Sequence, residues 1–82
     1  MKVCVFASGS GGNCLLLEGG GTNILIDAGI SMRRIASGLA QAQLTMRDIG
    51  GVLITHEHSD HISGLKMLLK HHHLPVYAPH TV

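Results

Sequence analysis

The sequence predicts an α+β fold in which a mostly antiparallel sheet carries its helices on one face. Three short apolar segments separated by glycine-rich stretches have the pattern of two successive hairpins, at residues 2–6, 13–18 and 22–27. A segment with apolar residues at helical spacing follows, and then a continuous apolar run. This order of strands, helix and buried strand indicates a half-sandwich, with one sheet and one layer of helices.

A glycine- and serine-rich loop is expected at residues 7–12, between the first two strands. Gly9-x-Gly11 begins like a dinucleotide-binding fingerprint, but Cys14 stands where the last glycine belongs. The segment after it is strand-like, whereas phosphate binding by this motif needs a helix N-terminus. The glycines are therefore expected to permit a tight connection, and contact with substrate is the alternative.

The rest of the chain supplies the helices and the remaining strands. Ser31 can cap a helix whose apolar stripe consists of Met32, Ile35, Ala36 and Leu39. The apolar run Gly51–Thr55 suits a strand that is buried on both faces. A second apolar stripe over residues 62–69 predicts another helix, and Val76–Ala78 is expected as the last strand.

Composition excludes several classes of protein. The net charge of +1 gives no electrostatic argument for tight nucleic-acid binding. No apolar run approaches the ~18 residues of a membrane span, and the apolar start of the chain is too short for a signal peptide. We therefore expect a cytoplasmic protein without a membrane partner, in which Cys4 and Cys14 are reduced thiols that do not bind metal.

The chemistry is concentrated in His56-Glu57-His58-Ser59-Asp60-His61. Histidine nitrogens and carboxylate oxygens are zinc ligands, and carboxylates also admit manganese. Residues two apart in an extended segment face the same way, so His56 and His58 can converge on one ion. Asp60 and His61 can then be aimed at a second ion nearby. A solvated histidine-rich turn is the alternative, but the density of ligand-type residues favours a metal site.

The other polar clusters have simpler explanations. His71-His72-His73 is expected at a helix C-terminus, where the helix dipole favours positive charge. Nothing in the sequence makes His80 a metal ligand. Arg33 and Arg34 lie off the apolar stripe and are expected on a solvated helix face.

Thr55–Leu65 resembles the His-x-His-x-Asp-His signature of the metallo-β-lactamase-fold hydrolases. Ile24–Gly29 looks like the Asp-containing strand end of that superfamily. Ser8–Cys14 is similar to the first-hairpin loop of a bacterial branch related to ribonuclease Z, which contains small cytoplasmic proteins, some described as DNA exonucleases. The resemblance implies that residues 1–82 form a single partial domain, the N-terminal half of an αβ/βα sandwich, whose absent C-terminal half supplies further metal ligands. It places Asp27 beneath the metal loop as an orienting group.

The resemblance also implies a metal-dependent hydrolase, specifically a nucleic-acid phosphodiesterase or exonuclease. Two divalent ions, with zinc as the first choice and manganese as the alternative, would activate a hydroxide. His56 and His58 would hold the first ion, and Asp60 and His61 the second. Asp60 would also accept a hydrogen bond from the hydroxide, which makes it the candidate catalytic residue.

Two alternatives stay open at this point. One is a thioester, lactone or β-lactam hydrolase of the same fold, and the other is a non-catalytic metal-binding fragment. The 82-residue chain alone is expected to be inactive or nearly so. It is also expected to expose an apolar sheet face, which would lead to self-association or require the missing half.

Overall fold

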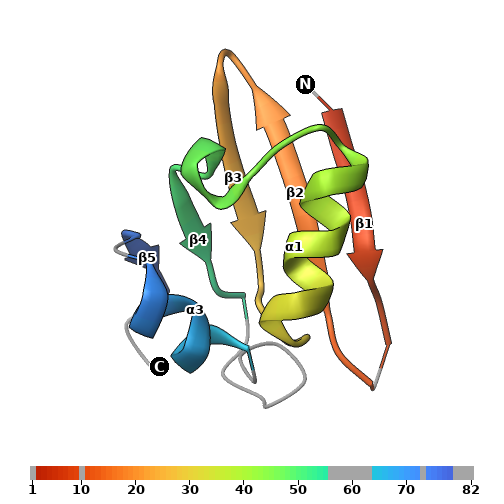
Figure 1. Ribbon diagram of the computed structural model, residues 1–82, viewed down its shortest axis with the longest axis vertical. Coiled ribbons are helices and arrows are strands. Elements are labelled where there is room, and N and C mark those ends of the chain that lie inside the picture. The colour runs from red at the N-terminus through yellow and green to blue at the C-terminus, as the bar shows by residue number, and fades with distance from the viewer. Residues whose placement is uncertain (1, 10, 56–63, 73, 79–82) are drawn as a thin grey trace.

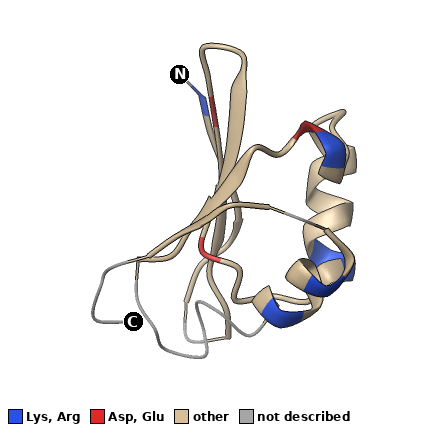
Figure 2. Ribbon diagram, turned by 90° about the vertical axis from the view of Figure 1, so that its left-hand side faces the viewer, with Lys and Arg blue, Asp and Glu red and all other residues tan. Residues whose placement is uncertain are grey.

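The computed structural model describes residues 2–9, 11–55, 64–72 and 74–78. The strands form one sheet in the order β1-β2-β3-β4-β5, and they are β1 (Lys2–Ala7), β2 (Cys14–Gly19), β3 (Thr22–Ile26), β4 (Gly51–Leu53) and β5 (Val76–Tyr77). The helical elements are α1 (Met32–Gln41), the 3-10 helix η1 (Met46–Asp48) and α3 (Leu65–His71). Figures 1 and 2 show these helices on one side of the sheet. The predicted α+β fold class is confirmed.

The sheet combines an antiparallel meander with two parallel additions. β1, β2 and β3 pair antiparallel, and this part contains most of the registered residue pairs. β4 pairs parallel to β3, and β5 pairs parallel to β4, because the connections between them cross one face of the sheet through helices. The carboxyl ends of β3 and β4 therefore lie at one edge of the sheet, where β2 also begins (Figure 1). We call this the motif edge.

The core lies between the sheet and the helices. Ile35 and Leu39 of α1 and Leu68 of α3 are buried. They belong to one hydrophobic cluster with the sheet residues Cys14, Leu16, Leu25 and Val52. Residues two apart in a strand face the same side, so the alternation in β2 brings Cys14 and Leu16 onto the helix-covered face. Burial of this face against the helices is the main stabilising interaction of the fold.

Local capping fixes the ends of the helical segments. The hydroxyl of Ser31 accepts a hydrogen bond from the N–H of Arg34 at 3.3 Å, as expected for an N-cap. At η1, the N–H of Thr45 donates to Oδ2 of Asp48 at 2.8 Å, which forms part of a capping box. In the ranges that the structure describes, no helix has the length and apolar character needed to cross a bilayer.

The opposite face of the sheet is apolar and exposed. Val3 and Val5 on β1 are 58% and 60% exposed, and Tyr77 on β5 is also exposed. The expectation that Gly51–Thr55 is buried on both faces was wrong for Leu53, which is 37% exposed. The reason is that the described helices cover only one side, so the continuous apolar character of this strand is not matched by a second layer in the described part of the chain.

Candidate metal centre

The four predicted ligands lie in the segment 56–63, outside the described residues. They are His56, His58, Asp60 and His61. The structure describes both residues that flank this segment, Thr55 and Gly64. These two residues connect the segment to the described part of the fold.

Asp27 holds the first end. Its carboxylate accepts two hydrogen bonds from Thr55, one from the N–H to Oδ1 and one from the hydroxyl to Oδ2, each at 2.7 Å. The N–H of Asp27 donates to the carbonyl of Leu53 at 2.7 Å, and the residue is only 5% exposed. Hydrogen bonds to a carboxylate are among the stronger ones in proteins. Asp27 therefore fixes Thr55, the residue that precedes His56.

Gly64 holds the second end. Its N–H donates to the carbonyl of Ala28 at 2.7 Å. A Cβ at this position would lie 3.0 Å from that carbonyl oxygen and would collide with the carbonyl oxygen of Ile30. Only glycine fits such a close approach of two backbones. The two residues that flank the segment 56–63 are thus hydrogen-bonded to Asp27 and Ala28, which directly follow β3.

The glycine loop also contacts the motif edge, through Gly12 and Asn13. The side chain of Asn13 closes the loop, because its Oδ1 accepts from the N–H of Gly9 at 3.1 Å and its Nδ2 donates to the carbonyl of Gly9 at 3.0 Å. The N–H of Gly29 donates to the carbonyl of Asn13 at 2.9 Å. Gly12 has a φ of 141° and packs so closely on Gly29 that a Cβ would lie 2.5 Å from its carbonyl oxygen. The strand that follows confirms that this loop does not lead into a helix.

Cys14 is the first residue of β2, at the motif edge, and its thiol is neutral at pH 7. Burial raises its pKa from 9.0 to about 12, the negative charge of Asp27 adds to the rise, and the positive charge of Arg34 opposes it. The thiolate is the form that binds metals and attacks electrophiles. A neutral, buried Cys14 is therefore a core residue, and Cys4 is also a free thiol.

His71 and His72 lie at the C-terminal end of α3. His71 is the last residue of the helix, and His72 is its C-cap, with its N–H donating to the carbonyl of Leu68 at 2.9 Å. This confirms the predicted helix end, while His73 and His80 lie outside the described residues. Within the described ranges, no three His, Cys, Asp or Glu side chains are grouped closely enough to hold a metal ion.

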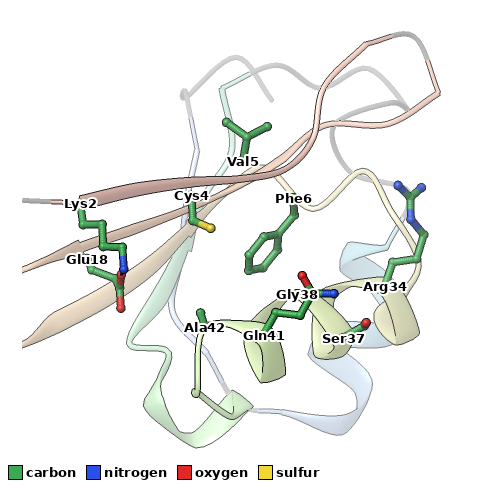
Figure 3. A pocket seen from close by; sticks show the side chains of 10 residues that line it. All are labelled: Lys2, Cys4, Val5, Phe6, Glu18, Arg34, Ser37, Gly38, Gln41 and Ala42. Atoms are coloured by element: carbon green, nitrogen blue, oxygen red, sulfur yellow. The ribbon is translucent and has the colours of Figure 1, made fainter.

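A cavity of about 430 Å³ lies between β1 and α1 (Figure 3). Figure 3 shows Lys2 and Glu18 at one end, where they form an ion pair at 4.0 Å, and Arg34 at the other end. Phe6 points into the space between the strand and the helix. The cavity is built by β1 and α1 and not by the strand ends that support the motif, so we assign it no part in the metal centre.

The family model of the metallo-beta-lactamase superfamily matches residues 7–82. The chain belongs to this superfamily. The match covers the glycine loop, the Asp27 strand end and the histidine motif, and it confirms the resemblance. In the metallo-beta-lactamase superfamily, the supports described above therefore belong to the N-terminal part of the fold.

Three relatives are similar over most of this chain. Exodeoxyribonuclease YycJ of Bacillus anthracis is 47% identical over 90% of this chain and 28% of its own length. Exodeoxyribonuclease WalJ of Streptococcus pneumoniae is 43% identical over 94% of this chain and 29% of its own length. Ribonuclease Z of Methanopyrus kandleri is 39% identical over 79% of this chain and 24% of its own length. The chain thus spans less than a third of the length of each of these relatives.

Sequence reasoning missed the supporting role of Thr55. A signal for Thr55 was present, since a hydroxyl residue closes an apolar run directly before His56. Gly64 is the N-cap of α3, and a Cβ there would collide with the carbonyl oxygen of Ile30. The contacts themselves join residues 28 apart in sequence, such as Asp27 and Thr55, and no local pattern reveals them.

Replacing Asp27 by Ala is expected to lower the free energy of unfolding by about 3 kcal/mol, because two hydrogen bonds to a charged acceptor are lost. Asp27→Asn is the matched control. Its backbone has a φ of 66°, which Asn tolerates, and one carbonyl acceptor remains, so a loss of about 1 kcal/mol is expected. Urea denaturation of the three proteins measures both effects. Equal stability of Asp27→Ala and the wild type would contradict the role given to this carboxylate.

Proposed function

We propose that the protein is a metal-dependent hydrolase that cleaves phosphodiester bonds of nucleic acid, acting as an exonuclease. The proposal rests on the hydrogen bonds made by the two residues that flank the segment 56–63. Thr55 donates to Asp27, and Gly64 donates to Ala28. A segment rich in metal-ligand side chains, with both flanking residues hydrogen-bonded at one edge of the sheet, meets a requirement of a preorganised metal site. The names of the exodeoxyribonuclease relatives support nucleic acid as the substrate.

The donor set fits divalent metal ions. His56, His58 and His61 offer imidazole nitrogens, Asp60 offers a carboxylate, and this mixture suits zinc first and manganese second. We assign His56 and His58 to a first ion, and Asp60 and His61 to a second ion. Bound there, such ions lower the pKa of a coordinated water to about 7 and so make hydroxide available at neutral pH.

The side chains of this chain have separate tasks in the proposed reaction. Asp60 accepts a hydrogen bond from the nucleophile and orients it, which makes it the catalytic residue of this part of the protein. Asp27 acts through Thr55, by fixing where the segment starts, and is a positioning residue. Because the chain spans less than a third of its exodeoxyribonuclease relatives, the proposal includes further ligands from outside residues 1–82, and it places the whole protein in the cytoplasm.

We further propose that the exposed sheet face is covered by another part of the longer protein. Val3 and Val5 lie on this face beside the half-buried Leu15 and Leu17, so the apolar surface spans neighbouring strands. Exposed apolar patches of a few hundred Å² mark association surfaces. Residues 1–82 alone are therefore expected to self-associate in sedimentation velocity. A stable monomer over a wide concentration range would contradict this expectation.

The function is tested by offering the metal-loaded, full-length protein a panel of substrates. We expect it to release nucleotides from the end of a DNA strand and to lose this activity when a chelator removes the metal. Readdition of zinc or manganese should restore the activity. Hydrolysis of a thioester, a lactone or a β-lactam in the absence of DNA cleavage would overturn the nuclease assignment within the same superfamily.

A further inference from the structure

Most of the positive charges of the chain lie on two helices, although its net charge is only +1. Four of the six Lys and Arg residues lie in α1 and α3, and neither helix contains Asp or Glu. They are Arg33, Arg34, Lys66 and Lys70, and all four are exposed. Figure 2 shows blue segments gathered on the helices beside the sheet, with no red segment on either of these helices. We call these four residues the basic helix face.

The basic helix face starts at the motif edge. Arg33 and Arg34 lie in the first turn of α1, and Lys66 is the second residue of α3. The two helix starts meet, because Gly64 packs against the carbonyl oxygen of Ile30, which directly precedes the N-cap of α1. Gly64 is also the residue that follows the segment 56–63. Arg33, Arg34 and Lys66 therefore lie in the first turns of two helices whose starts are in contact at the motif edge.

Helix stability does not explain Arg33, Arg34 and Lys66, whereas Lys70 lies in the last turn of α3, where positive charge is favourable. Positive charge in the first turn of a helix is unfavourable, because the helix dipole is positive there. Among the described residues, the ion pair joins Lys2 to Glu18 and involves none of the four. The described carboxylate of Asp48 is bonded to Thr45 instead. Arg33, Arg34 and Lys66 are exposed, do not stabilise their helices and lack a described ionic partner, so they are suited to an anionic ligand.

We propose that the basic helix face binds the sugar-phosphate backbone of a single nucleic-acid strand and leads it to the metal site. This inference rests on the proposed nuclease function and adds the surface that holds the substrate. Phosphate contacts by Lys and Arg position a strand without reading its sequence. Lys66 and Lys70 are one helical turn apart, so they extend the positive surface along α3, away from the motif edge.

The test measures binding of fluorescein-labelled single-stranded DNA with phosphorothioate linkages, by anisotropy over a series of salt concentrations and with metal present. The variant is Arg33→Gln/Arg34→Gln/Lys66→Gln in the full-length protein. We expect its affinity at low salt to fall about 10-fold or more, because each lost phosphate contact removes released counterions. The slope of log affinity against log salt should become shallower by about 2 for three lost contacts on a single strand.

The matched control is Lys2→Gln/Arg47→Gln, which removes two cations outside the basic helix face. Its DNA affinity should stay within about twofold of the wild type, because these two cations do not contact phosphates in the proposed complex. Arg33→Lys/Arg34→Lys should retain most of the binding, and circular dichroism should show the same fold for all variants. A shallower slope in the control but not in the triple variant would overturn the proposal.

The outcomes separate this inference from the function on which it rests. If the wild type cleaves and binds DNA while the triple variant binds with the same affinity and slope, the basic helix face does not bind the strand. The proposed nuclease function is then unaffected. If the wild type neither binds nor cleaves DNA but hydrolyses another substrate class, the proposed function fails and this inference fails with it.

Discussion

Replacing Asp60 by Ala in the full-length protein is expected to reduce phosphodiester hydrolysis by at least about 100-fold, because it removes an anionic ligand and the acceptor that orients the nucleophile. The second ion should leave or bind far more weakly. The fold should survive, because the ends of the segment are held by Asp27 on Thr55 and by Ala28 on Gly64, independently of Asp60. Elemental analysis and an activity assay on the purified variant measure both losses.

His72→Ala is the matched control for this experiment. His72 is the C-cap of α3, and its backbone N–H, which the substitution keeps, makes the capping hydrogen bond. Metal content and activity should therefore remain close to those of the wild type. The assignment of the ligands is wrong if Asp60→Ala keeps two ions and full activity, or if His72→Ala alone removes the metal.

The second large effect is expected from Gly64→Ala, which should lower the free energy of unfolding by about 3 kcal/mol. An added Cβ collides with backbone oxygen, not with a mobile side chain, and forced overpacking of this kind costs about 1–3 kcal/mol or more. The displacement should also loosen the second end of the segment 56–63 and weaken metal binding. Thermal or urea unfolding, together with a zinc titration, measures these changes.

Gly11→Ala provides the comparison, since a Cβ at Gly11 has no heavy atom within 4 Å. It should change stability by less than about 0.5 kcal/mol, as is usual for exposed positions away from special features. Equal stability of the two variants would show that the contact between Gly64 and Ile30 does not constrain the fold.

The local parts of the fold could be predicted from the sequence because their causes are local. Glycine-rich turns between apolar segments predicted the β1–β3 meander to within a residue or two of its observed ends. The Ser31 cap and the spacing of Ile35 and Leu39 predicted α1, and both side chains are buried. The superfamily followed from the motif and was confirmed by the family match.

The remaining features depend on contacts between distant parts of the chain. The exposure of Leu53 is decided by which layers cover the sheet, and a continuous apolar run carries no information about that. The link between Asp27 and Thr55 joins two strand ends that become neighbours only when β3 and β4 pair in parallel. Likewise, the basic helix face exists because two helix starts meet, and the net charge of +1 gave no indication of it. The four ligands stay predictions, supported by residue type and spacing.

The most direct test of the metal site is anomalous diffraction at the zinc edge from crystals of the zinc-loaded, full-length protein. We expect anomalous density about 2.0–2.1 Å from ring nitrogens of His56 and His58, and a second peak beside Asp60 and His61. The Asp27 carboxylate should remain on Thr55 and bind no metal. Zinc held at His71–His73 or His80, or density that touches none of the four predicted ligands, would contradict the account.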